Sequence, residues 1–120
     1  MTKTYFDLIG EDNVWQLIAD FYEGIKTNEI LRPMYPDALE PAQERLFLFI
    51  MQYLGGPGIY GEQRGHPRLR MRHVRFQINQ QARDAWMANM KAAIEKNAMP
   101  EQGKEFLLKY FDDTATFLMN

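Results

Sequence analysis

Apolar side chains recur every three or four residues along four stretches of this 120-residue chain, and this spacing constrains the fold more than any other feature. The four stretches are residues 14–25, 42–53, 82–94 and 106–118. A half-buried strand would instead alternate apolar and polar residues, and no stretch of the sequence does so. The sequence therefore predicts an all-α fold. We expect Asp12 or Asn13 to cap the first helix, Pro41 to open the second and Asn79 to cap the third.

The segment YLGGPGIYGEQRGHPRLRMRHVRF, residues 53–76, interrupts the helical pattern. It holds five of the eight glycines and both histidines. We expect a loop as far as about Pro67 and a short helix from there to His73. The preceding helix, 42–53, is apolar nearly all round, which predicts burial on two sides. Neighbouring helices can cover both sides, and periodicity alone favours that reading, but a bound planar cofactor would also serve.

Composition excludes several classes of protein. The chain has neither cysteine nor serine, which rules out disulfides, thiolate metal sites and serine hydrolases, and its net charge of −2 gives no sign of nucleic-acid binding. The longest apolar run, LFLFIM, is too short to span a membrane, and the N-terminal residues do not resemble a signal peptide. We expect one cytoplasmic domain covering residues 1–120, with no nucleic-acid or membrane partner.

The two histidines differ in their surroundings. His66 lies between Gly65 and Pro67, which predicts an exposed turn and a surface or capping role. His73 can ride on the short helix, although a lone helical histidine is more often structural than a ligand. Zinc sites and di-iron sites need more ligands than this chain offers. Haem iron needs one histidine, an apolar slot and cations for its propionates, and neighbouring arginines could supply these cations or form a solvated helix face.

Five motifs carry a family likeness: FYEGI, LRPMYP, YLGGPGIY, GHPRLRMRH and RDAWM, in this order. Together they resemble the group II truncated haemoglobins, and the resemblance extends from about residue 9 to the last helix. It implies a two-over-two sandwich of antiparallel helices around haem b. It also implies that an extended loop largely replaces the short helix that usually carries the proximal histidine.

The resemblance assigns roles to individual residues. His73 corresponds to the proximal iron ligand, and Trp86, Tyr22 and Tyr35 correspond to hydrogen-bond donors of the distal pocket. The other implied positions are Ala42 and Leu46 facing the ligand, Phe49 and Ile50 in the pocket wall, Tyr60 and Arg72 as propionate partners, and Arg68 and His66 as further contacts. Because Ala42 and Leu46 cannot donate hydrogen bonds, we expect the donors at 22, 35 and 86 to hold the ligand.

The function implied by the resemblance is binding of O₂, and of NO and CO, with slow release that suits redox chemistry or ligand detoxification. Peroxidase-like or NO dioxygenase turnover is the alternative, so enzymatic activity stays open, and electrons would come from an unidentified reductase. We expect a monomer or weak dimer. The competing reading is a cofactor-free helical interaction module in which His73 is a core residue.

Overall fold

The computed structural model describes residues 3–73 and 76–120, and within these ranges the chain is helical with no β-strand. The elements are α1 (Tyr5–Ile9), α2 (Glu11–Thr27), the 3₁₀ helix η1 (Arg32–Met34), α3 (Glu40–Tyr53), α4 (Ile59–Arg64), α5 (Leu69–His73), α6 (Gln80–Glu95) and α7 (Glu101–Phe117). The all-α prediction is therefore confirmed. None of the described helices combines the length and the apolar character needed to cross a membrane.

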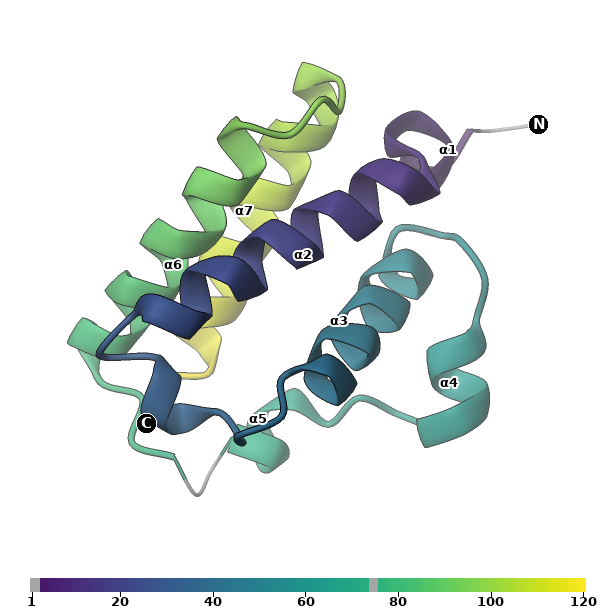
Figure 1. Cartoon of the computed structure of the whole chain (residues 1–120). Coiled ribbons are helices and arrows are strands. Elements are labelled where there is room, and N and C mark those ends of the chain that lie inside the picture. Colours follow the sequence, from purple (N-terminus) through teal and green to yellow (C-terminus); the bar gives the residue numbers. More distant parts are fainter. Residues whose placement is uncertain (1–2, 74–75) are drawn as a thin grey trace.

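The long helices form two antiparallel pairs (Figure 1). Helix α2 packs against α3, α6 packs against α7, and α2 also crosses α6, so that one pair lies over the other. The short helices α4 and α5 follow one another along the edge of this arrangement; in Figure 1, α4 lies to the right of α3 and α5 lies below it. This is the two-over-two sandwich that the sequence predicted.

Helix α2 is the centre of the core. Its buried side chains are the six that the periodicity predicts: Val14, Leu17, Ile18, Phe21, Tyr22 and Ile25. The crossing with α6 is close at Gly24, where a Cβ would lie 1.8 Å from the Asn89 side-chain oxygen. The Asn89 amide nitrogen donates a hydrogen bond of 2.9 Å to the Phe21 carbonyl on α2. A missing side chain and a single carboxamide thus set the spacing of the two helices.

The observed helix ends match the predicted ones where a single capping residue determines the end. Asn79 caps α6 by accepting a hydrogen bond from the Ala82 N–H at 2.8 Å, as predicted. The prediction for α2 is wrong, because the helix begins at Glu11 directly after Gly10. Gly10, with φ of 88°, lets α1 end and α2 begin at one residue, a conformation that favours glycine. Neither α1 nor α4 was predicted, and α4 occupies part of the expected loop.

Helix α3 is less enclosed than its composition suggests. Ile50 and Met51 are buried, Phe47 to Phe49 are half-buried, and Tyr53 is 45% exposed. Two-sided burial is therefore only partly confirmed. Pro41 lies in the first turn of α3, as its missing N–H and fixed φ predict.

Candidate functional site

A cavity of about 640 Å³ lies among the helices, with walls from η1, from α2 to α7 and from the segments that join them. Its lining is mostly aliphatic and aromatic, with a few polar groups. This volume and this mixture are typical of sites for small molecules and cofactors. The cavity brings together side chains from Tyr22 to Leu118, so it depends on the whole fold.

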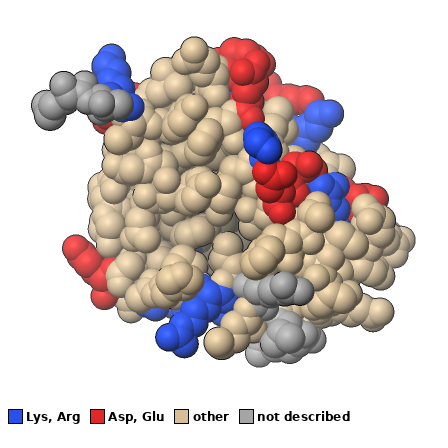
Figure 2. Space-filling model, turned by 180° about the vertical axis from the view of Figure 1, so that it is seen from behind, with Lys and Arg blue, Asp and Glu red and all other residues tan. Residues whose placement is uncertain are grey.

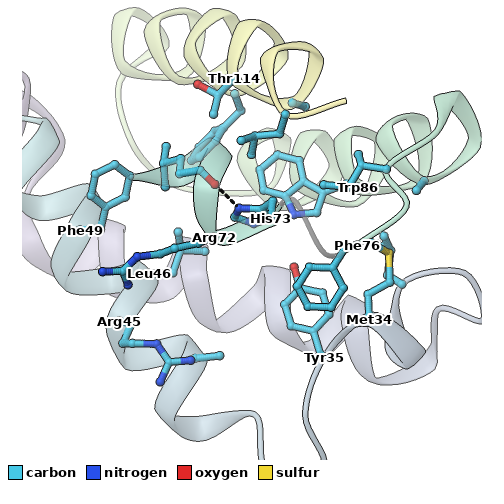
Figure 3. A pocket seen from close by; sticks show the side chains of 18 of the residues that line it. Met34, Tyr35, Arg45, Leu46, Phe49, Arg72, His73, Phe76, Trp86 and Thr114 are labelled. Carbon is cyan, nitrogen blue, oxygen red and sulfur yellow. Dashed lines mark hydrogen bonds between the residues drawn. The ribbon is translucent and has the colours of Figure 1, made fainter. Parts of the chain in front are cut away.

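His73 enters this cavity from the end of α5 (Figure 3). Its ring nitrogen Nδ1 lies 2.6 Å from the carbonyl oxygen of Leu69, one helical turn earlier. Because a carbonyl can only accept, Nδ1 carries the proton and Nε2 is left with its lone pair. An imidazole fixed in this tautomer by a backbone carbonyl is typical of metal-binding histidines.

Three aromatic residues from different elements share the cavity wall: Tyr22 of α2, Tyr35 beside η1 and Trp86 of α6. The rings of Tyr22 and Tyr35 meet edge to face, with centroids 5.8 Å apart. The indole nitrogen of Trp86 points toward the hydroxyl group of Tyr35 (Figure 3). Trp86 is held from behind by Phe21 and Phe111, with centroids at 5.1 and 5.5 Å.

Burial keeps both phenols protonated. It raises the pKa of Tyr22 well above its ordinary value of 10; the neighbouring Tyr35 adds to this, and Arg45 acts in the opposite direction. Burial also raises the pKa of Tyr35 to about 12, although the hydrogen bond from Trp86 lowers it. At neutral pH both hydroxyl groups therefore remain O–H donors, in surroundings where an added hydrogen bond is worth more than it is in water.

Three arginines line the described part of the cavity; Arg83 of α6 pairs with Asp84 and Asp112, and the other two lie on the α3 and α5 side. Arg45 and Arg72 line it, and Figure 3 places both guanidinium groups on the side of Leu46 and Phe49. Figure 2 shows the opposite face of the molecule from Figure 1, with basic side chains gathered at the lower edge and acidic ones along the upper right. Carboxylates of a bound cofactor would find guanidinium partners at Arg45 and Arg72.

The structure brings together most of the residues singled out from the sequence. The cavity wall includes His73, Tyr22, Tyr35, Ala42, Leu46, Phe49, Ile50, Tyr60, Arg72 and Trp86. Tyr60 is buried and packs on Phe49 with ring centroids 5.3 Å apart. His66 and Arg68 are not among the lining residues. His66 is exposed, and its Nδ1 accepts the Arg68 backbone N–H at 3.0 Å, in agreement with the exposed turn that the sequence predicts.

Sequence reasoning missed other wall residues. Arg45 lies one turn after Ala42 on α3, so the helical spacing of the predicted pocket positions could have identified it. Phe76, Tyr110 and Thr114 also line the cavity. Tyr110 and Thr114 belong to the apolar face of a helix, and Phe76 belongs to no periodic pattern. Only the tertiary structure shows that these side chains face the cavity.

The donor set of the cavity fits haem better than it fits a bare metal ion. Across residues 3–73 and 76–120, no three His, Cys, Asp or Glu side chains come close enough to hold a metal ion. A metal bound by the one imidazole needs further ligands, which a porphyrin supplies. The flat apolar walls suit its ring, and the arginines suit its propionates. A two-over-two helical fold around such a cavity defines a truncated globin.

Comparison with known proteins leads to the same class of protein. The family model for bacterial-like globins matches residues 4–120. The chain is 36% identical to the group 2 truncated haemoglobin YjbI of Bacillus subtilis, over 96% of this chain and 87% of that protein. Haemoglobin structures from Chloroflexus aurantiacus and Thermobifida fusca superpose with TM-scores of 0.96 and 0.94, at 41% and 43% identity. Coverage of both chains is 99% for the first and 98% for the second. The chain belongs to the bacterial-like globin family, as a group II truncated haemoglobin.

Membership establishes the general chemistry. Haem is the cofactor of this family, and its members bind small gaseous ligands such as O₂ at the haem iron. The general function predicted from the sequence is thereby confirmed, and the reading as a cofactor-free module is wrong.

Proposed function

We propose that His73 binds the haem iron through Nε2 and that the chain holds O₂, and also NO and CO, beneath Tyr22, Tyr35 and Trp86. Haem b, when bound, supplies the iron at which these gases coordinate. The observation that carries the proposal is a single cavity lined by an imidazole with Nδ1 tied to a carbonyl and by three aromatic donors. Each protein group then has a separate task.

The task of His73 is to present a fixed nitrogen. The hydrogen bond to the Leu69 carbonyl, 2.6 Å long, prevents the ring from flipping and makes Nε2 more basic. A more basic Nε2 would also make haem iron, when bound, a stronger electron donor to a gaseous ligand. The same bond therefore supports both retention of the cofactor and retention of its ligand.

The task of the distal groups is to donate hydrogen bonds to that negative charge. Tyr22 is 5% exposed, so water competes weakly for its hydroxyl group. The Trp86 indole nitrogen faces the oxygen of Tyr35, whose own O–H is left to donate. Such donors are worth most where water is excluded, so the arrangement predicts slow O₂ release. A truncated haemoglobin from Bacillus subtilis with 36% sequence identity is described as oxygen-avid, which supports this reading.

The assignment of His73 is tested by His73→Gly. We expect the purified variant to lose its haem, or to show a changed Soret band, because no second histidine lines the described part of the cavity. Added imidazole should restore the original spectrum by filling the space left by the side chain. The matched control is His66→Gly, which removes the exposed histidine. If the spectrum of His73→Gly matched that of the unchanged protein, the assignment would be wrong.

Arg45 and Arg72 are proposed to bind the propionates. Arg45→Met and Arg72→Met should each speed the transfer of haem to an acceptor protein, since each removes a charge-assisted hydrogen bond. Arg64→Met, an exposed arginine of α4 outside the wall, is the control. Equal transfer rates in all three variants would exclude the propionate role.

Turnover of peroxide or NO is a further possibility, with an external reductase as electron source. The cavity supplies groups for holding a ligand, and ligand binding with slow release is the function that it supports best. Steady-state assays with hydrogen peroxide or NO and an added reductant separate the two: turnover would add catalysis to ligand binding, and no turnover would leave binding alone.

A further inference from the structure

Asn120 makes an unusual set of hydrogen bonds with the stretch that follows α5. Its side-chain oxygen accepts the Ile78 backbone N–H at 3.0 Å, and its side-chain nitrogen donates to the Phe76 carbonyl at 2.7 Å. The same nitrogen lies 3.4 Å from the His73 carbonyl. The Asn120 backbone N–H donates to the Ile78 carbonyl at 3.2 Å. All four bonds reach residues within five positions of the imidazole.

These bonds tie the end of α7 to the cavity wall. Asn120 follows α7 by three residues, and Leu118, between them, lines the cavity. Phe76 and Ile78 line it as well, and Ile78 is buried. The bonds of Asn120 therefore hold a segment that forms part of the cofactor site, although Asn120 itself is exposed and outside the wall.

The helix that carries His73 cannot fix its own position. Helix α5 has five residues, little more than one turn, and an isolated helix of that length is unstable. The direction of the imidazole must come from tertiary contacts on either side of α5. On the side after His73, the described contacts include the turn from the Phe76 N–H to the His73 carbonyl, 3.0 Å, and the bonds of Asn120.

A carboxamide suits this position for a chemical reason. Asparagine offers a donor and an acceptor side by side, as a peptide group does, so it can pair with the Ile78 N–H and the Phe76 carbonyl at once. A carboxylate only accepts, and its second oxygen would face the carbonyls of Phe76 and His73. The identity of the side chain, and not only its size, therefore matters.

We propose that Asn120 is a positioning residue for the proximal imidazole: its carboxamide clamps the segment after α5 and thereby holds His73 in the direction needed by iron. This inference rests on the proposed assignment of His73 to iron. It adds a residue outside the cavity wall, 47 positions away along the chain, to the groups that control the iron–imidazole bond.

The test uses haem-loaded protein in the ferrous, ligand-free state, with Asn120→Ala, Asn120→Asp and the control Gln81→Ala, which removes an exposed carboxamide from α6. Resonance Raman reports the iron–imidazole stretching band, and transfer to an excess of a haem-accepting protein reports haem loss. We expect both Asn120 variants to shift or broaden the band and to lose haem about tenfold faster, which corresponds to about 1.4 kcal/mol. The control should behave as the unchanged protein.

The variants also separate the possible failures. Asn120→Asp keeps the shape and the acceptor for Ile78, so it should fold as the unchanged protein does by circular dichroism. An unchanged band and haem-loss rate in both Asn120 variants would overturn the clamp while leaving His73 in place. If His73→Gly without imidazole kept the same iron–imidazole band, the ligand assignment would fail, and the clamp with it.

Discussion

Replacing Trp86 by phenylalanine should speed the release of O₂ from the haem-loaded protein. The new ring keeps contacts with Phe21 and Phe111, which now lie 5.1 and 5.5 Å from the indole centroid, so the wall remains closed. The indole N–H, which points toward the Tyr35 hydroxyl, is lost. The variant therefore isolates the contribution of one donor.

The size of the effect follows from the hydrogen bond removed. A bond to a charged partner contributes about 1.5 to 3 kcal/mol, and about 1.4 kcal/mol is a tenfold change in rate. Because the indole N–H also faces the Tyr35 oxygen, only part of its hydrogen bonding is given to the ligand, which reduces the loss. We expect O₂ dissociation to rise about tenfold, toward the lower end of that range.

Stopped-flow displacement of O₂ by CO measures the rate directly, and Trp15→Phe is the matched control. Trp15 is 47% exposed and packs edge to face on Phe47, outside the cavity wall. Because Trp86 and Tyr35 are joined, Trp86→Phe and Tyr35→Phe should not be additive when combined. An O₂ dissociation rate in Trp86→Phe equal to that of the Trp15 control would refute the role of the indole N–H.

Two further predictions concern stability. Burial raises the pKa of Tyr22, Tyr35 and Tyr110, the last two to about 12. In the unfolded chain these phenols titrate near pH 10, so the free energy of unfolding should be undiminished below pH 10 and should fall as the pH rises toward 12. Spectrophotometric titration of the folded protein should show three tyrosines that ionise well above pH 10. The variant Tyr35→Phe should show only two. Gly24→Ala gains up to about 1 kcal/mol of helix propensity but must displace Asn89 from its bond to α2. Urea unfolding should therefore show little net change in the single variant and a gain of about 1 kcal/mol when the same change is made in an Asn89→Ala background; equal effects in both backgrounds would contradict the close contact.

The features predicted correctly from the sequence are those with a local cause. The face of α2 follows from spacing alone, and Asn79 caps α6 because a carboxamide at that position bonds its own helix. Helices α1 and α4 escaped prediction because five or six residues show too little of a period; α5 is equally short, but a helix between Pro67 and His73 was predicted and is confirmed. The ends of α1 and α4 depend on a glycine conformation, as at Gly10, that the sequence allows but does not require.

The features of the candidate site also separate into those that the sequence predicts and those that depend on tertiary packing. Motifs placed Tyr35 and Trp86 in one pocket, but neither spacing nor motif indicates that the indole nitrogen points at the phenol. Tyr110 and Thr114 entered the cavity wall through the packing of several helices, which no single stretch of sequence encodes, whereas the spacing after Ala42 could have identified Arg45. His66 was correctly separated from His73, since its neighbours alone predict an exposed turn.

The contact between Gly24 and Asn89 has a consequence for how proteins of this shape can diversify. The spacing of α2 and α6 is fixed by a glycine and a carboxamide, one turn or less from the residues that face the cavity. Substitutions at Tyr22 or Trp86 should therefore change the cavity wall without moving the two helices apart. Helix spacing and cavity lining thus depend on different residues, so the lining can be altered while the backbone stays the same.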